Sequence, residues 1–243
     1  MRFNYIKLYF FPLLILLSFI SSAQIDVLKN ISNTANSFIY TEKIQSDKDI
    51  SNGLTEALRI SVIKSCDNAS QVNGFYKNDD IKIPFPSKIN KVKKACLKIG
   101  LNKLVLDFEY SMNQTAELVS STAAEIIVQA VSSLRFNDAI KILNGSENEA
   151  TLYLKDKSFD NLYDTFYPTV KNKMDSTGVQ KILDLILTRY NKIPLVKKVK
   201  FDLTDYITLQ TIGGIFYLIA ENEKEIRNNP KARTTQILKK IFN

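Results

Sequence analysis

The chain contains no histidine and no tryptophan, and it has only two cysteines, seven glycines and six prolines among 243 residues. The missing histidine removes the usual general base, the usual metal ligand and the usual partner of a serine or cysteine nucleophile. The shortage of glycine and proline disfavours an all-β domain, which needs many turns. The sequence also has no nucleophile motif, no glycine-rich phosphate loop and no metal-ligand spacing, so we predict no cofactor, metal or catalytic residue.

The first 23 residues have the anatomy of a secretory signal. Arg2 and Lys7 give a positive start, an apolar run follows from Leu8 to Ile20, and small residues occupy positions 21–23. The run is too short for a membrane span. We therefore expect residues 1–23 to be removed by cleavage near Ala23, the protein to be exported to the periplasm, and the mature chain to carry no transmembrane span.

The formal net charge is +8. The basic residues are mostly lysines spread along the chain, and the densest cluster, at residues 197–200, is short, so we interpret them as a solvated surface. Nucleic acid is not expected as a partner because an exported protein does not meet the genome. The partner is unknown, and a protein or lipid of the cell envelope, including an anionic membrane surface, remains open.

Apolar residues recur with the helical period of 3.6 along most of the chain. The clearest stripe is Leu101, Leu104, Val105, Phe108, Met112, Ala116 and Val119. This pattern predicts that residues 24–243 form a single all-α domain, a helical bundle of about eight to ten helices. Prolines indicate two extended connecting segments, Gly74–Pro86 and Pro194–Leu203, which could pair as short β-strands.

Several local signals predict where helices begin and end. Ser146 and Glu149 have the spacing of a capping box at the start of a short helix. Pro168 interrupts an apolar stripe and should kink or break a helix near Tyr167. Gly178 should end that helix, and the pair Gly213-Gly214 inside an apolar helix indicates a close helix crossing.

The two cysteines, Cys66 and Cys96, both fall on apolar helical stripes. They are either separate buried thiols, since cysteine packs well as a small apolar residue, or a disulfide. A disulfide would close a loop of about 30 residues and add roughly 3–4 kcal/mol in the chain-entropy model.

Acidic residues suggest one candidate cluster. Asp107, Glu109 and Asn113 lie on the strongest helix, where Glu109 and Asn113 are four residues apart and share a face that does not include Asp107. A paired-carboxylate site is one interpretation and an ordinary polar face is the other. The three glutamates within Glu221–Glu225 are interpreted as a solvated face.

The C-terminal region is the most site-like part of the chain. It combines two arginines, two hydroxyls and a predicted helix start, which together can hold a phosphate or a carboxylate. The predicted anion or partner site consists of Arg227, Asn229, Arg233, Thr234 and Thr235. The alternative is that both arginines pair with local acids and cap helices.

Eight blocks of sequence carry a family resemblance: Ile81–Pro86, Asp107–Glu117, Phe136–Gly145, Ala150–Tyr153, Phe166–Val170, Tyr190–Val196, Phe201–Thr208 and Gly214–Phe242. With these blocks the chain resembles the bacterial family catalogued as domain of unknown function 4197. The resemblance implies an exported, mostly helical protein. It implies no activity, cofactor or catalytic residue.

We therefore expect a non-catalytic exported protein that binds a partner or supports the envelope. The first alternative is a carrier of a lipid or another apolar ligand, since many short helices rich in Ile, Phe and Tyr can enclose an apolar cavity. The second alternative is a hydrolase that uses carboxylates such as Asp107 and Glu109.

Overall fold

The computed structural model describes residues 48, 50–233, 238–239 and 242. The chain divides into two units, Met1–Lys48 and Asp49–Asn243. The predicted signal lies outside the described residues. All elements below belong to the second unit.

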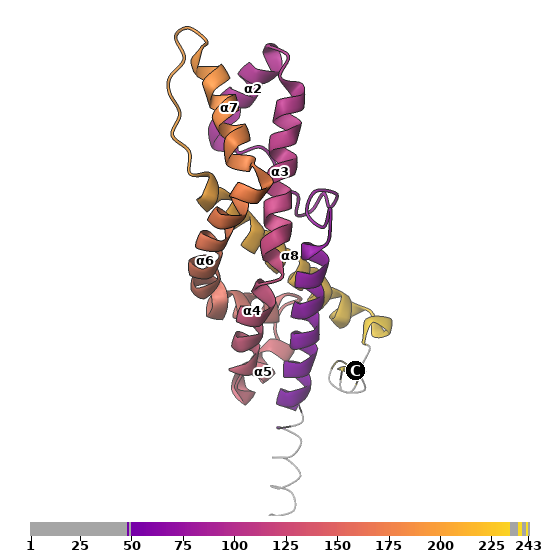
Figure 1. Cartoon of the computed structure of the whole chain (residues 1–243). Coiled ribbons are helices and arrows are strands. Elements are labelled where there is room, and N and C mark those ends of the chain that lie inside the picture. The colour runs from indigo at the N-terminus through magenta and orange to yellow at the C-terminus, as the bar shows by residue number, and fades with distance from the viewer. Residues whose placement is uncertain (1–47, 49, 234–237, 240–241, 243) are drawn as a thin grey trace, which may run out of the picture. The chain divides into compact units, whose positions relative to one another are not determined.

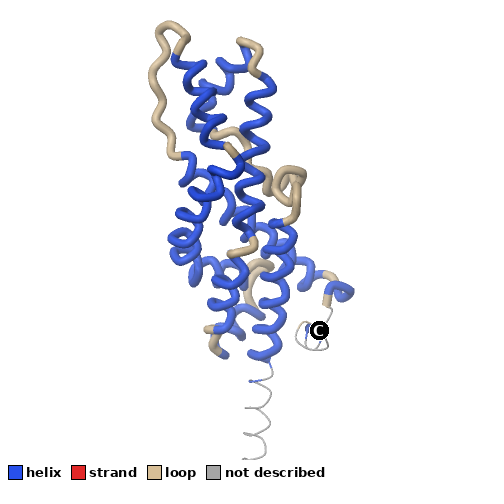
Figure 2. Tube along the Cα trace, in the orientation of Figure 1, coloured by secondary structure: helices blue, strands red, loops and turns tan. Residues whose placement is uncertain are grey.

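The described part of the second unit is helical, and the all-α prediction is confirmed (Figures 1 and 2). A first helix covers residues 50–70. The later elements are η1 (Ser87–Ile89), α2 (Asn90–Lys98), α3 (Asn102–Ser120), α4 (Ala123–Ser132), α5 (Phe136–Leu143), α6 (Glu149–Thr177), α7 (Val179–Asn191), α8 (Leu203–Asn228) and η2 (Pro230–Ala232). The described residues include no strand, so the two predicted extended segments do not pair with each other. The prediction that Gly74–Pro86 is extended is wrong for its first part, because residues 74–77 and 79–81 form hydrogen-bonded turns.

The core lies where α6 packs against α8, α3 and α4. Apolar residues four apart form its rows, as the periodicity predicts. In α6 the row is Leu162, Phe166, Val170 and Met174, all of them buried. Of the two predicted effects of Pro168, a kink or a break, the break does not occur, because α6 is continuous through the proline. The buried side chains before and after Pro168 hold both halves of the helix in the core, and this packing offsets the lost backbone hydrogen bond.

The turn between α6 and α7 consists of Gly178 alone. Its φ of 69° lies in the left-handed region, where glycine avoids the steric cost of a side chain. The prediction that this glycine ends the helix is confirmed, and it lets α7 begin at the next residue.

The two glycines within α8 face opposite environments. A Cβ atom on Gly214 would lie 2.6 Å from Cε1 of Phe75, a fully buried side chain, so Gly214 does permit a close approach, but of a loop and not of the crossing helix that the sequence predicts. A Cβ atom on Gly213 would have no neighbouring atom within 4 Å. Only Gly214 is therefore needed for the close contact between α8 and the loop after the first helix.

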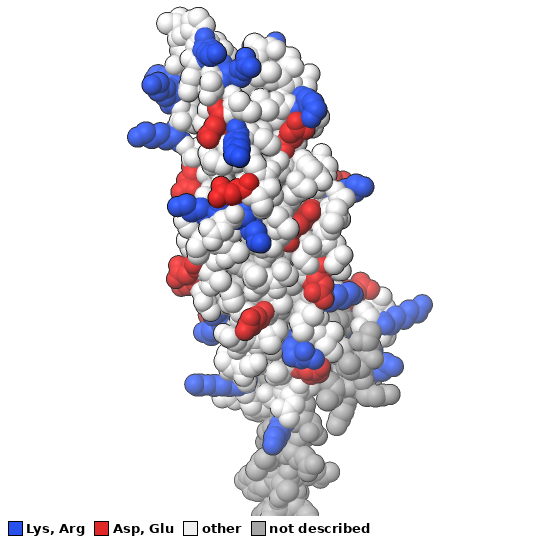
Figure 3. Space-filling view, in the orientation of Figure 1, with Lys and Arg blue, Asp and Glu red and all other residues white. Residues whose placement is uncertain are grey.

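Charged side chains of both signs are scattered over the face drawn in Figure 3. Lysine and arginine gather in the upper part of this view, where Figure 1 places α2, the start of α3 and the end of α7. The sequence did not predict this gathering, because the residues come from separate segments.

Candidate functional site

The predicted anion site begins at Arg227 in the last turn of α8 and continues beyond the end of this helix. The helix begins at its N-cap Asp202, whose side chain accepts a hydrogen bond from the backbone N–H of Asp205. It ends at Asn228, before the Asn229-Pro230 pair. Glu223 lies four residues after Ile219 and continues the apolar stripe of this helix, so it faces the interior and is only 5 % exposed.

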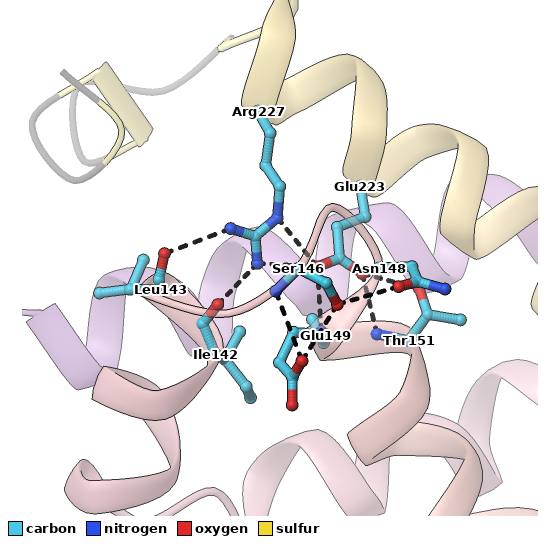
Figure 4. Close-up of polar contacts among 9 residues, drawn as sticks. Ile142, Leu143, Ser146, Asn148, Glu149, Thr151, Glu223 and Arg227 are labelled. Atoms are coloured by element: carbon cyan, nitrogen blue, oxygen red, sulfur yellow. Dashed lines mark hydrogen bonds and ion pairs between the residues drawn. The ribbon is translucent and has the colours of Figure 1, made fainter.

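The Glu223 carboxylate caps the N-terminus of α6 (Figure 4). Its Oε1 accepts a hydrogen bond from the backbone N–H of Ala150 at 2.9 Å. Its Oε2 accepts two more, from the N–H and the Oγ1 of Thr151, both at 2.8 Å. These N–H groups belong to the first turn of α6, where a helix has no internal acceptors and where its dipole favours a negative charge.

Arg227, one turn further along α8, caps the C-terminus of α5 (Figure 4). Its Nη2 donates to the carbonyl oxygen of Ile142 at 2.7 Å, and its Nη1 donates to that of Leu143 at 3.3 Å. A cation is favoured at this end of a helix. Nε and Nη2 also donate to Oε1 of Glu223, at 3.1 and 2.9 Å.

This buried ion pair, which we call the Glu223–Arg227 junction, fastens α8 to the corner between α5 and α6. The two side chains are 5 % and 11 % exposed. Two charges can be buried together in this way because each also meets the helix end of matching polarity. The interpretation of Glu221–Glu225 as a solvated face is therefore wrong at its central residue.

Arg233 and Asn229 also make local structural contacts. Arg233 donates from Nε to the carbonyl oxygen of Ile226 at 3.0 Å and from Nη2 to that of Arg227 at 2.9 Å, which caps the C-terminus of α8. Asn229 accepts a hydrogen bond from the backbone N–H of Lys231 and so caps η2. Thr234 and Thr235 lie outside the described residues. Both arginines thus adopt the alternative arrangement, in which they cap helices.

A hollow of about 20 Å³ lies beside the junction, between the first helix and α8. The Oγ of Ser61 borders it and has no hydrogen-bond partner among the described residues. Such a volume holds about one water molecule, and an acyl chain does not fit. This hollow is therefore too small to support the alternative that the protein carries a lipid.

The second predicted cluster is divided between two sides of α3. Asp107 forms an exposed ion pair with Lys103, whose Nζ lies 2.7 Å from Oδ2. Glu109 pairs with Lys93 of α2 at 2.7 Å and is only 13 % exposed. Each carboxylate therefore has its own lysine, and the structure does not bring the two together.

Asn113 holds the extended segment Ile81–Pro86 against α3. Its Oδ1 accepts a hydrogen bond from the backbone N–H of Ile83 at 2.8 Å, and its Nδ2 donates to the carbonyl oxygen of the same residue at 2.9 Å. The side-chain amide thus takes the place of a neighbouring strand. This contact satisfies the backbone of a buried residue that has no sheet partner.

Glu117, one turn beyond Asn113, holds the preceding loop. Its Oε1 accepts hydrogen bonds from the backbone N–H groups of Phe75 and Tyr76 at 3.1 and 3.2 Å, and its Oε2 accepts one from Asn73 at 3.1 Å. Asn73 has a φ of 64°, which helps turn these N–H groups toward one carboxylate. Sequence reasoning did not select Glu117, although a glutamate inside the strongest apolar helix was a signal.

Cys66 and Cys96 are separate free thiols, and each is buried. The structure therefore has the first of the two arrangements considered and not the disulfide. Burial raises the pKa of Cys66 to about 12, and the nearby Asp67 carboxylate adds to the shift. Burial also raises the pKa of Cys96. Thiols in this state are poor nucleophiles and poor metal ligands.

The larger hollows lie on the surface and have mixed linings. One, of about 300 Å³, lies between α5 and α6 and includes Asp138, Lys141, Tyr153 and Lys157. Within the described ranges, no three or more Cys, Asp or Glu side chains gather as metal ligands would. No helix in the described part is both long enough and apolar enough to cross a membrane.

The comparisons with known proteins give one match. No curated protein and no solved structure matches the chain. A family model matches residues 44–243, which include all the polar contacts described above. The chain therefore belongs to the family described as protein of unknown function (DUF4197).

Proposed function

We propose that the chain is an exported, non-catalytic protein of the cell envelope that acts by presenting its surface to a partner. The observation that carries this proposal is the use of its buried polar side chains. Asn113, Glu117, Glu223, Arg227 and Arg233 all bond to backbone groups, and together they fix two loops and several helix ends.

The two carboxylates considered for a hydrolase support the same proposal. Glu109 is neutralised by Lys93, and Asp107 by Lys103 on another side of α3. A paired-carboxylate hydrolase needs both groups within reach of one substrate bond. With the interior devoted to structure, binding falls to the exposed helix faces and to the surface loops.

The predicted leader supports the envelope location and is the part to test. We would express the full chain with a C-terminal tag in a bacterium with two membranes, separate the cytosol from the periplasm and membranes, and sequence the N-terminus. The expected product begins at Gln24 and is found outside the cytosol. The matched control is Leu14→Arg with Leu17→Arg, which breaks the apolar run and should keep the protein inside. Cytosolic protein that retains Met1 in both cases would contradict the proposal.

A second measurement separates binding from catalysis. Because Asn113 and Glu223 hold the backbone, we expect Asn113→Ala and Glu223→Gln to lower the amount of folded protein in the envelope. An enzyme that used Glu109 would instead lose function in Glu109→Gln at an unchanged protein level. A deletion-strain defect that Glu109→Gln fails to complement, with normal protein abundance, would favour the hydrolase.

A further inference from the structure

Two segments of the chain are rich in lysine and arginine and contain no acidic residue. Residues 88–103 include six lysines, and residues 189–200 include one arginine and four lysines. Two of these eleven cations, Lys93 and Lys103, form ion pairs. Among the described residues, the other nine form none. We call the surface formed by residues 88–103 and 189–200 the basic end.

The fold brings these segments together although about 85 residues separate them in the sequence. Helix α7 packs against both α2 and α3. A surface hollow of about 320 Å³ joins the turn at Gly100 and Leu101 to Leu185 and Arg189 of α7. Figure 1 shows the α2–α3 turn and the α7–α8 loop side by side at the top of the view, and Figure 3 shows lysine and arginine side chains around them.

Both tips of the basic end also expose large aliphatic side chains. Leu97 and Ile99 flank Lys98 at the α2–α3 turn and are 41 % and 51 % exposed. Leu195 follows Pro194 at the tip of the α7–α8 loop and is fully exposed, so no packing inside the protein explains an apolar residue there. Its φ of 65° is unfavourable for a leucine, so the fold holds this side chain outward at some conformational cost.

Resting on the proposed envelope function, we propose that the basic end docks on the surface of an anionic phospholipid bilayer. Lysines attract the anionic head groups, and the leucine and isoleucine tips insert at the boundary with the acyl chains. This combination of charge and short apolar insertion is typical of proteins that lie on a membrane without spanning it. Single-stranded nucleic acid is a poorer fit, because it is bound on exposed aromatic side chains and the tips are aliphatic.

Vesicle flotation tests the electrostatic part. The full chain is mixed with vesicles of phosphatidylcholine alone or with about one third phosphatidylglycerol, at salt concentrations whose Debye lengths are roughly 10 Å and 3 Å. We expect binding to the anionic vesicles alone and its loss at high salt. Lys197→Glu with Lys198→Glu should weaken binding at least tenfold. The matched control, Lys141→Glu with Lys155→Glu, reverses two exposed lysines of α5 and α6 and should bind as the parent does.

A tryptophan reporter tests insertion, since the chain has none of its own. In Leu195→Trp we expect the emission maximum to shift to shorter wavelength when phosphatidylglycerol vesicles are added. Leu152→Trp, at an exposed position of α6 outside the basic end, should show no shift. Leu195→Ala should weaken vesicle binding without changing the circular dichroism, because this side chain packs against nothing.

Each outcome decides the proposal. It is overturned if the parent protein binds neutral and anionic vesicles equally. It is also overturned if the control reversal at Lys141 and Lys155 weakens binding as much as the reversal at Lys197 and Lys198, or if the protein binds single-stranded nucleic acid and does not bind vesicles. An exported protein that ignores vesicles would overturn membrane docking and leave the proposed function intact. A protein that stays in the cytosol with its leader attached would overturn the proposed function, whatever the vesicles show.

Discussion

Replacing Glu223 with glutamine tests the central structural claim, that one buried carboxylate caps α6 and neutralises Arg227. The substitution keeps the size and shape of the side chain. It changes one carboxylate oxygen into an NH2 group, which donates and cannot accept hydrogen bonds. Three donors now bond to Oε1 and two to Oε2. In either orientation of the amide, at least two donors lose their acceptor.

The expected magnitude follows from burial. Arg227 is 11 % exposed, so Glu223→Gln leaves a mostly buried cation without its counter-ion. Removing one partner of a buried pair costs roughly 3–5 kcal/mol, and we expect the lower end because glutamine retains some of the contacts. With a urea slope of about 2–3 kcal/mol per molar, the midpoint of unfolding should fall by about 1–1.5 M.

The assay is urea unfolding followed by circular dichroism, with hydrogen exchange at Ala150 and Thr151 as the local readout. Glu221→Gln is the matched control, because it removes an exposed charge from the same helix and should change stability by less than about 0.5 kcal/mol. Glu223→Gln combined with Arg227→Met should cost less than the two single substitutions added together, because neither charge is then left unpaired. A Glu223→Gln midpoint equal to that of Glu221→Gln would refute the reasoning.

Three further predictions concern packing, the side-chain amide on α3 and the thiols. Gly214→Ala should destabilise the folded protein by about 1–3 kcal/mol, because the added methyl group would overpack the core. Gly213→Ala should stabilise it by roughly 0.5–1 kcal/mol, because alanine favours the helix and has free space there. Thermal unfolding midpoints that move in the same direction for both variants would contradict this prediction. Asn113→Ala should cost about 2–4 kcal/mol and speed exchange of the Ile83 amide, and an unchanged exchange rate would count against the strand-like contact. The pKa of Cys66 is raised from 9.0 to about 12, so the thiol should resist a disulfide reagent at pH 8 until the protein unfolds. The stability that the neutral, buried thiol contributes should be complete below pH 9 and should be lost as the pH rises to 12. A rapid reaction of the folded protein at pH 8 would disprove burial of the thiol.

The local elements of this fold could be predicted from the sequence. Helix α3 has an apolar row at helical spacing, and the end of α6 has a glycine whose left-handed conformation needs no tertiary information. Residues 82–84 lie outside any helix or turn, as expected next to prolines, because residues before proline avoid the helical region. These features depend on neighbours only a few residues away.

The long-range contacts could not be predicted. At the predicted capping box, the Glu149 carboxylate accepts hydrogen bonds from the backbone N–H and the Oγ of Ser146. Helix α6 nevertheless has Asn148 as its N-cap and begins at Glu149, and its first N–H groups are capped by Glu223 from 72–73 residues away. The helix is not the short one that the sequence predicts, because it continues for 29 residues. A capping residue nearby in the sequence therefore does not determine where a helix begins when a buried carboxylate of another helix binds its first N–H groups.

The same limit applies to the candidate sites. Arg227 and Arg233 were recognised as unusual residues, but their acceptors are backbone carbonyls, which carry no sequence signal. The lysines of the basic end look dispersed until α7 returns to α2. Sequence reasoning selected the two arginines and interpreted the lysines as a solvated surface, and in neither region could it identify the neighbours of these residues.

The junction on α8 also bears on the order in which the protein can form. The groups that complete the ends of α5 and α6 lie 73 and 85 residues further along the chain, so the ribosome makes this corner well before it makes Glu223 and Arg227. During that interval only water can satisfy the open helix ends. A nascent or truncated chain that ends before Glu223 should therefore have a loose α5–α6 corner that proteases can cut. Once α8 is made and packed, its two charged side chains cap both helix ends and protect this corner.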